Sequence, residues 1–415
     1  MLVCQLSLHR LYVTREKNLP SGKGVYNPVV NKPTLVYHAD WSSLAAKRWC
    51  AKATLGGYGR YTASEPVRVG DLTKLIGNLR AEAGEHRTVF AGFDFPIGVP
   101  AHFAERAGIA RFRDLLPQLG TGVWKDFYAV CDTPEEISVR RPFYPMSSRK
   151  GSLRQHLFDA HKAKTIEDLL RLCERGGGGQ RQACSLFWTL GANAVGKAAL
   201  VGWRDVLVPA LEEKSIKLWP FDGKLESLFK PGFTVVVETY PAECYGWFPG
   251  DPLASKADMN SRKKYGSRLL EWADGAGVEI APDLEKAITA GFPVGADDAF
   301  DAVVGLFGML KVCLGERDSG EPDDKTVREI EGWILGRQSQ PVEDASTAYS
   351  ANTDPDLADW LRWASESSEV PIFIRTVAEA ASIADLPSYA LLRPVLLELK
   401  RQRPRTVPTE TLIRR

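Results

Sequence analysis

The sequence of 415 residues has almost no excess of charge, with 53 basic and 52 acidic side chains and a formal net charge of +1. Long-range attraction to a nucleic acid or to an anionic membrane surface calls for a strongly basic protein. A balanced sequence therefore predicts that any nucleic-acid partner is bound through a local basic patch.

Long apolar runs are also missing. No stretch of about 18 apolar residues is present, so no transmembrane helix and no membrane partner are expected. The N-terminus lacks the basic, apolar and small-residue order of a signal peptide. The 7 cysteines are odd in number and include no C-x-x-C pair, which argues against a zinc ribbon and a disulfide framework. Together these absences favour a cytoplasmic protein.

What the chain does have is enough apolar material for a folded core, with 44% hydrophobic and 10% aromatic residues. Residues 1–33 are mixed and poorly periodic, and we interpret them as an N-terminal extension that need not belong to the native protein. Residues 34–338 carry the strand and helix patterns of one domain. Residues 339–415 show only helical patches, which predicts a small helical C-terminal extension.

The first part of the domain has the pattern of a sheet. Residues 34–69 predict three strands separated by turns, and residues 71–85 have the apolar spacing of a helix. Residues 87–100 form a nearly continuous apolar run, as expected for a strand that is buried on both faces.

The rest of the domain is mostly helical in pattern. From about residue 102 to residue 231 the apolar residues recur with helical spacing, which indicates a helix-rich insertion. A strand pattern returns in GFTVVVETY, and two helical segments follow it, RKKYGSRLLEWADGAG and DDAFDAVVGLFGMLKVCL. The sequence therefore predicts an α/β fold with a mixed sheet and flanking helices.

Five acidic residues are candidate catalytic residues and metal ligands. Asp40 follows LVYHA, Asp94 lies inside FAGFDFPIG, and Glu238 follows TVVV. A carboxylate buried without a partner is costly, so three of them in one sheet need an explanation. Asp298 and Asp301 are three residues apart and share one helix face. Oxygen ligands of this kind suit Mg²⁺ or Mn²⁺, and a pair of such ions can cleave phosphodiester bonds.

Each of these acids also has a structural explanation. Asp94 precedes a Phe-Pro pair and could form an Asx-turn, and Asp40 could cap the turn that follows it. Asp298 and Asp301 could stabilise the first turn of a helix through its dipole. Glu238 could pair with a basic residue of the insertion. Taken singly, none of the five residues requires a metal ion.

The order of the acids along the chain resembles that of a known protein family. The segments YHADWSS, VFAGFDFPIGVP, VVVETYPAECYG and DDAFDAVVGLFGML, with the closing EGWILGR, resemble the motifs of domain-of-unknown-function family 429. That family is regarded as a predicted RNase H-like nuclease, and Holliday-junction resolvases carry a similar terminal D-x-x-D. The resemblance covers residues 34 to about 337. It implies an RNase H-like fold with Asp40 on the first strand, Asp94 on the fourth, Glu238 on the fifth, and Asp298 and Asp301 on the closing helix.

Local basic stretches could bind the phosphates of a substrate. Residues 140–154 and 256–268 are rich in Arg and Lys, although solvated loops are an equally good explanation of both. Lys197 or an arginine of the first stretch could stabilise charge in a transition state. The candidate substrate-binding residues are Arg140, Arg141, Arg149, Lys150, Lys197, Lys263 and Arg268.

The favoured hypothesis is a metal-dependent nuclease or phosphodiesterase that takes DNA or RNA as substrate and Mg²⁺ or Mn²⁺ as cofactor. The first alternative is an RNase H-like module that binds nucleic acid or nucleotide without turnover. The second is an actin-like or sugar-kinase-like ATPase. The glycine-rich phosphate loop that an ATPase needs near its first acid is absent from DWSSLAAKR, so the ATPase ranks last.

Overall fold

The computed structural model describes residues 32–147, 152–176, 182–191 and 195–339. The chain divides into two compact units, residues 1–339 and 340–415, and every described residue belongs to the first. Nearly all of the expected N-terminal extension and of the expected C-terminal helical extension therefore lies outside the described residues.

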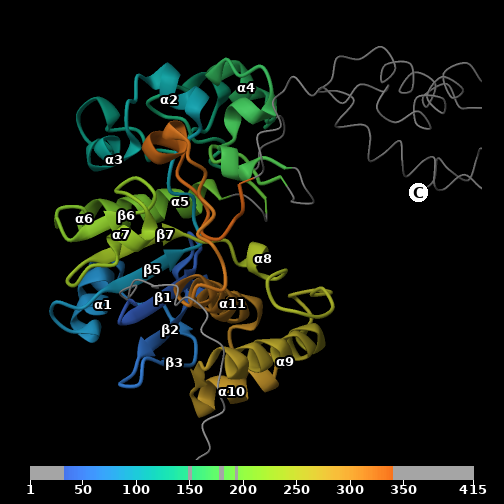
Figure 1. Ribbon diagram of the computed structural model, residues 1–415. Coiled ribbons are helices and arrows are strands. Elements are labelled where there is room, and N and C mark those ends of the chain that lie inside the picture. Colours follow the sequence, from blue (N-terminus) through green and yellow to red (C-terminus); the bar gives the residue numbers. More distant parts are fainter. Residues whose placement is uncertain (1–31, 148–151, 177–181, 192–194, 340–415) are drawn as a thin grey trace, which may run out of the picture. The chain divides into compact units, whose positions relative to one another are not determined.

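One mixed sheet of eight strands organises the described part of the chain, in the order β6-β7-β5-β1-β2-β3-β8, with β4 paired to β2. Figure 1 shows the long strands lying side by side across the middle of the molecule. The expected opening meander is present, since β1 is antiparallel to β2 and β2 to β3. Strands β5 and β7 then continue the sheet parallel to β1. The strands are β1 (Leu35–Asp40), β2 (Trp49–Leu55), β3 (Tyr61–Ala63), β4 (Val67–Arg68), β5 (Val89–Phe93), β6 (Ile216–Leu218), β7 (Thr234–Glu238) and β8 (Glu279–Ile280).

Eleven α-helices accompany the sheet within the described residues, and the mixed α/β class expected from the sequence is confirmed. In this part of the chain none of the helices combines the length and apolarity that crossing a bilayer requires. The helices are α1 (Leu75–Ala83), α2 (Ala101–Ala107), α3 (Phe112–Leu115), α4 (Gln155–His161), α5 (Gly196–Gly202), α6 (Val208–Ala210), α7 (Leu225–Leu228), α8 (Pro241–Cys244), α9 (Met259–Ala276), α10 (Pro282–Thr289) and α11 (Ala296–Cys313).

Both faces of the sheet are buried, and the period-two alternation of strand side chains divides the core into two clusters. Along β1, Tyr37 and Ala39 belong to the first cluster, whereas Val36 belongs to the second. The first cluster includes residues of α1 and of the insertion helices α2, α3 and α5. The second includes residues of α9, α10 and α11, which Figure 1 shows together on one side of the sheet.

Helix α11 packs closely against β1 at a glycine. A Cβ atom at Gly305 would lie 2.2 Å from the imidazole of His38, so only glycine fits the helix at this distance from the strand. The His38 ring is fixed by hydrogen bonds of 2.9 Å to the carbonyl of Ala302 and to the hydroxyl of Thr239. Burial lowers the pKa of His38 to about 4. These contacts place the first turns of α11 over the carboxyl end of β1.

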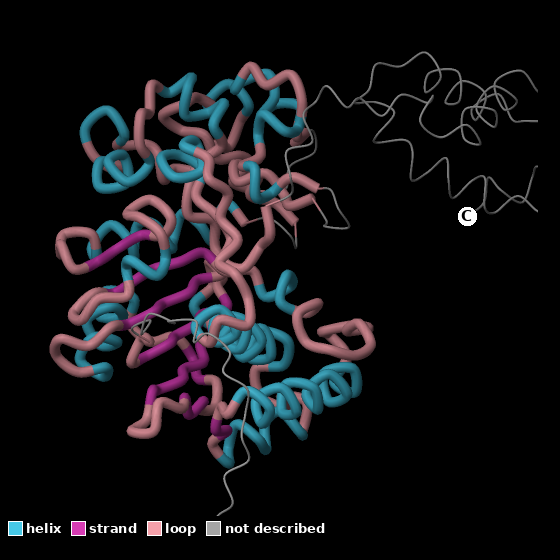
Figure 2. Tube along the Cα trace, in the orientation of Figure 1, coloured by secondary structure: helices cyan, strands magenta, loops and turns pink. Residues whose placement is uncertain are grey.

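The expected insertion between residues 102 and 231 contains one element that its helical pattern does not predict. Short helices joined by loops make up most of it, as Figure 2 shows in its upper part. Near its end, however, β6 pairs in parallel with β7 and extends the sheet by one strand. The I-K-L segment of β6 has only three residues, which is too short for its period to be distinguished from that of a helix.

Candidate functional site

Three carboxylates meet at one end of the sheet because the elements that carry them end or begin there. Asp40 is the last residue of β1, and Asp94 directly follows β5. These two strands are parallel, and the amide of Asp94 donates a hydrogen bond of 3.0 Å to the carbonyl of Ala39. Asp301 enters from α11 and is 2% exposed, while Asp40 is 9% exposed. We refer to Asp40, Asp94 and Asp301 as the acidic cluster.

The charges of the acidic cluster repel one another in a site with little water. Burial and then the charge of Asp301 raise the pKa of Asp94 to about 8. Burial, followed by the charges of Asp94 and Asp301, raises the pKa of Asp40 well above its usual value. The pKa of Asp301 is also raised, chiefly by burial. Protons or a cation must therefore neutralise part of this charge at neutral pH.

The chain itself supplies one cation to the acidic cluster. The ammonium of Lys256 lies 2.5 Å from Oδ2 of Asp301, and the hydroxyl of Tyr245 donates to Oδ1. Two residues of α9 hold this arrangement by hydrogen bonds: Arg262 donates to the carbonyl of Lys256 at 2.6 Å, and Tyr265 donates to that of Tyr245 at 2.9 Å. Burial alone would lower the pKa of Lys256, but the negative charge of Asp301 raises it above its usual value.

The acidic cluster has the donor chemistry of a divalent-metal site, but its side chains are not arranged as one. Among the described residues, no group of three or more His, Cys, Asp or Glu is placed to hold a metal ion. Both oxygens of Asp301 accept hydrogen bonds from the chain, which accounts for this. Mg²⁺ and Mn²⁺ prefer carboxylate oxygens, and a bound cation would relieve the repulsion that raises these pKa values. The donors have the chemistry that such an ion prefers, and the ion would have to displace the Lys256 ammonium from Asp301.

Glu238 points to the other face of the sheet. It is paired with Phe93 in the parallel register of β5 and β7, and Phe93 packs in the first core cluster, opposite α11. Its carboxylate accepts hydrogen bonds from the guanidinium of Arg171 at 2.6 and 2.7 Å and from the amide of Ile97 at 2.7 Å. Glu238 therefore pairs with a basic residue of the insertion, Arg171, which is the structural explanation given for it above. Repulsion from Glu238 still contributes to the raised pKa of Asp94.

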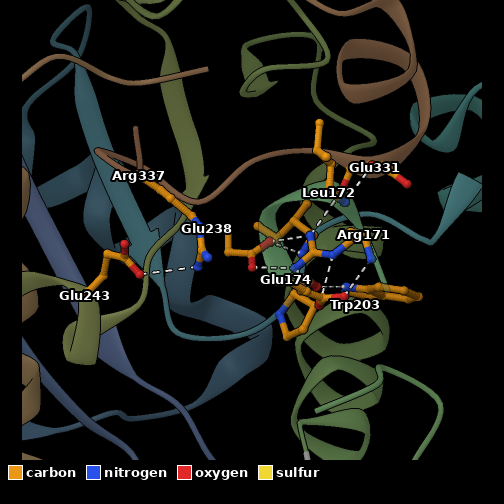
Figure 3. Close-up of polar contacts among 10 residues, drawn as sticks. Arg171, Leu172, Glu174, Trp203, Glu238, Glu243, Glu331 and Arg337 are labelled. Carbon is orange, nitrogen blue, oxygen red and sulfur yellow. Dashed lines mark hydrogen bonds and ion pairs between the residues drawn. The ribbon is translucent and has the colours of Figure 1, made fainter. Parts of the chain in front are cut away.

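Arg171 is the centre of a buried polar network, drawn in Figure 3. Its side chain is fully buried and lies between Glu174, at 2.9 Å, and Glu238. It also donates to the backbone carbonyl of Glu331 at 3.1 Å, and the Glu331 side chain accepts from the amide of Leu172 at 2.8 Å. The network joins the insertion, strand β7 and the segment after α11. It supports the loop that carries Asp94, because Glu238 binds the amide of Ile97.

Asp298, expected in the same set, lies at the margin of the acidic cluster. It is partly buried, and burial followed by the charge of Asp297 raises its pKa. Its charge also contributes to the raised pKa of Asp40. No hydrogen bond from a described residue to its carboxylate is present, in contrast with Asp301 three residues later. Of the D-x-x-D pair, Asp301 is the residue directed into the site.

The expected substrate-binding residues make contacts of their own away from the acidic cluster. Arg140 lies over the ring of Trp124 at 3.6 Å, Arg141 pairs with Glu136 at 3.2 Å, and Lys197 donates to the carbonyl of Met146 at 3.1 Å. On α9, Lys263 is partly buried, and Arg268 is 3.9 Å from Asp251. Arg149 and Lys150 lie outside the described residues. Within the described residues, no hydrogen bond or ion pair joins these side chains to the three acids of the cluster.

A cavity of about 290 Å³ opens beside the acidic cluster. Asp94 and Glu238 belong to its wall, which also includes Arg154, Gln182, Tyr240 and Arg337. Asp94 therefore belongs both to the acidic cluster and to the cavity wall.

Comparisons of the chain with protein-family models, with curated proteins and with solved structures find no match. We therefore infer function from the chemistry of the acidic cluster and of the cavity beside it.

Proposed function

We propose that the protein is a metal-dependent hydrolase of phosphodiester bonds that acts on nucleic acid, with Mg²⁺ or Mn²⁺ as its cofactor and the cytoplasm as its location. The observation that carries the proposal is the convergence of Asp40, Asp94 and Asp301 from β1, the end of β5 and α11. Buried carboxylates this close together repel one another, and a cation or a proton shared between them offsets that repulsion.

Each residue has a distinct part in the proposed site. Asp40, Asp94 and Asp301 would hold the ions, which when bound polarise the phosphate and activate water. If a bound ion displaced it from Asp301, the ammonium of Lys256 would remain beside the site and could stabilise negative charge on a phosphate there. Glu238 keeps the Asp94 loop in place through Ile97, so in this proposal it positions the site and holds no ion.

An RNase H-like fold is part of the same proposal. In its support, an antiparallel meander leads into parallel strands, and acids stand at the ends of the first strand and of its parallel neighbour. The helix with the D-x-x-D pair, α11, packs on β1 beside those acids. The resemblance of residues 34–337 to family 429 points to the same architecture.

The proposal is tested by assaying the purified protein on single-stranded, duplex and branched oligonucleotides, with Mn²⁺, with Mg²⁺ and with EDTA. We expect cleavage of at least one substrate in the presence of metal and none in EDTA. Asp40→Asn should abolish this cleavage, and Asp283→Asn, at an exposed position of α10, should not. No cleavage of any substrate by the wild-type protein would contradict the proposal.

One observation favours a second candidate, a nucleic-acid or nucleotide binding module without turnover. In such a module the acidic cluster needs a permanent counter-charge, and the Lys256 ammonium bound to Asp301 is one. This candidate predicts that oligonucleotides bind equally well in EDTA and in Mn²⁺ and are never cleaved. The first candidate predicts cleavage that depends on the metal ion.

A further inference from the structure

The cavity beside the acidic cluster differs in size from a groove for a duplex. Its volume of about 290 Å³ is just below the range for small-molecule sites, which is about 300 to 1,000 Å³. Asp94 is part of its wall, and the side chains of Phe95 and Ile334 line it as well. The space suits a single nucleotide, but it is too small for a base pair.

One arginine of the cavity wall has no acidic partner in the described part of the chain. Arg171 uses its guanidinium on Glu174, Glu238 and a backbone carbonyl, and Arg337 lies 3.3 Å from Glu243. Arg154, in contrast, is exposed, and its guanidinium lies 5.5 Å from the centre of the Trp188 ring. Its one described hydrogen bond is a long contact of 3.7 Å to the sulfur of Cys184. Arg154 is therefore the cation of the wall that is available to an anion.

An aromatic side chain shares the cavity wall with Asp94. Tyr240 is 39% exposed, which is unusual for a large ring next to the end of a central strand, and it lines the cavity. Burial, followed by the charge of Asp94, raises the pKa of its hydroxyl. An exposed ring at such a place can stack on a base, and the Gln182 amide on the same wall can hydrogen-bond a base edge.

We propose that this cavity, here called the Tyr240 pocket, binds one unpaired nucleotide, with its base against Tyr240 and its phosphate at Arg154. The inference rests on the proposed function and adds to it the substrate class: single-stranded nucleic acid, or an unpaired nucleotide at the end of a duplex. A paired base does not fit because its partner would require about twice the space. The nucleotide is held so that the phosphodiester bond next to it lies at Asp94.

The test is calorimetry of the full chain in EDTA, where cleavage does not interfere. The probes are the four nucleoside 5′-monophosphates, the corresponding nucleosides and inorganic phosphate. We expect at least one monophosphate to bind more tightly than its nucleoside and than phosphate. Arg154→Gln should remove most of the advantage that the phosphate gives, on the order of tenfold or more. Tyr240→Ala should weaken binding by about tenfold or more, whereas Tyr240→Phe keeps the aromatic ring and should bind as the wild type does.

Arg60→Gln, at an exposed position outside the pocket, is the matched control and should bind as the wild type does. Thermal unfolding of each variant shows whether it is folded; Arg154 is exposed, so its variant tests the pocket even if Tyr240→Ala fails to fold. The proposal is overturned if no monophosphate binds at millimolar concentration, if Arg154→Gln keeps the full advantage of the monophosphate over its nucleoside, or if Tyr240→Ala, when folded, binds as the wild type does.

Failure of this proposal and failure of the proposed function give different results. Mononucleotide binding in EDTA with no metal-dependent cleavage of any oligonucleotide would support the pocket and contradict the hydrolase. Metal-dependent cleavage by a protein that binds no mononucleotide would overturn the pocket alone.

Discussion

The ammonium of Lys256 lies 2.5 Å from the carboxylate of Asp301, so the acidic cluster contains a cation that the chain itself provides. The two partners differ in exposure, since the side chain of Lys256 is 47% exposed and that of Asp301 is 4% exposed. Lys256 precedes α9 in a segment outside the sheet, so its side chain can turn toward solvent without disturbing the core. A divalent ion at the cluster and the Lys256 ammonium must compete for Asp301.

This competition predicts that Lys256→Gln increases the affinity for metal. Removing a positive charge about 4 Å from the ion removes a repulsion whose strength corresponds to roughly fivefold or more in affinity. Calorimetric titration of the variant with Mn²⁺ measures the change. Lys264→Gln is the control, because Lys264 is exposed on α9 and pairs with the exposed Asp251. Equal or weaker binding by Lys256→Gln would show that Lys256 does not compete with the metal.

The raised pKa of Asp94 predicts how stability depends on pH. In EDTA the unfolded chain releases the Asp94 proton near the ordinary pKa of 3.8, whereas the folded chain keeps it until about pH 8. Between these values the folded state binds the extra proton, so the free energy of unfolding falls as the pH rises. Asp94→Asn should remove much of this slope and should be more stable than the wild type at pH 8, on the order of a few kcal/mol.

Denaturant unfolding at a series of pH values from 4 to about 9 measures the slope. Added Mn²⁺ should restore stability to the wild type at high pH by mass action, and it should stabilise Asp94→Asn less. A slope that is unchanged in Asp94→Asn would assign the pH dependence to other groups.

The fold was predictable wherever an apolar run had a clear period and length. The meander, the buried strand β5 and the long helices α9 and α11 are of this kind. The acids of β1 and β5 were recognisable because each ends or follows an apolar strand. Strand β6 could not be predicted, because three residues do not define a period.

The direction of Glu238 could not be predicted from its strand. The T-V-V-V run before it is buried on both faces of the sheet, so no alternation of polar and apolar residues tells which face Glu238 takes. Its contact with Arg171 joins residues 67 apart in the sequence, and the contact of Lys256 with Asp301 joins residues 45 apart. Partners at such distances are brought together only by the topology. For this reason sequence reasoning did not select Arg171 or Tyr245 for the site and placed Lys256 only in a basic stretch that could bind phosphate.

The position of Glu238 predicts that it contributes to stability more than to metal binding. Arg171→Met would leave two buried carboxylates without their cation and should cost about 3–5 kcal/mol of stability. Glu238→Gln should lower the stability as well, while changing the affinity for Mn²⁺ by less than about twofold, because the Glu238 carboxylate binds Arg171 and the amide of Ile97. Asp40→Asn is the comparison, and it should lower the Mn²⁺ affinity at least about tenfold.

Unfolding in denaturant and Mn²⁺ calorimetry on the three variants separate the two roles. A large loss of Mn²⁺ affinity in Glu238→Gln, with the stability unchanged, would restore Glu238 to the metal ligands.

The close contact between Gly305 and His38 predicts that Gly305→Ala is destabilising, although alanine favours helices. The new Cβ would lie 2.2 Å from the imidazole, so α11 must move away from β1, at a cost of about 1–3 kcal/mol. Because α11 carries Asp301, the same shift should weaken Mn²⁺ binding. Gly275→Ala in α9 is the matched control: a Cβ there meets no atom within 4 Å, so this variant should be as stable as the wild type or more so, by up to about 1 kcal/mol. If Gly305→Ala matched Gly275→Ala in both stability and Mn²⁺ affinity, the contact between α11 and β1 would not control the geometry of the acidic cluster.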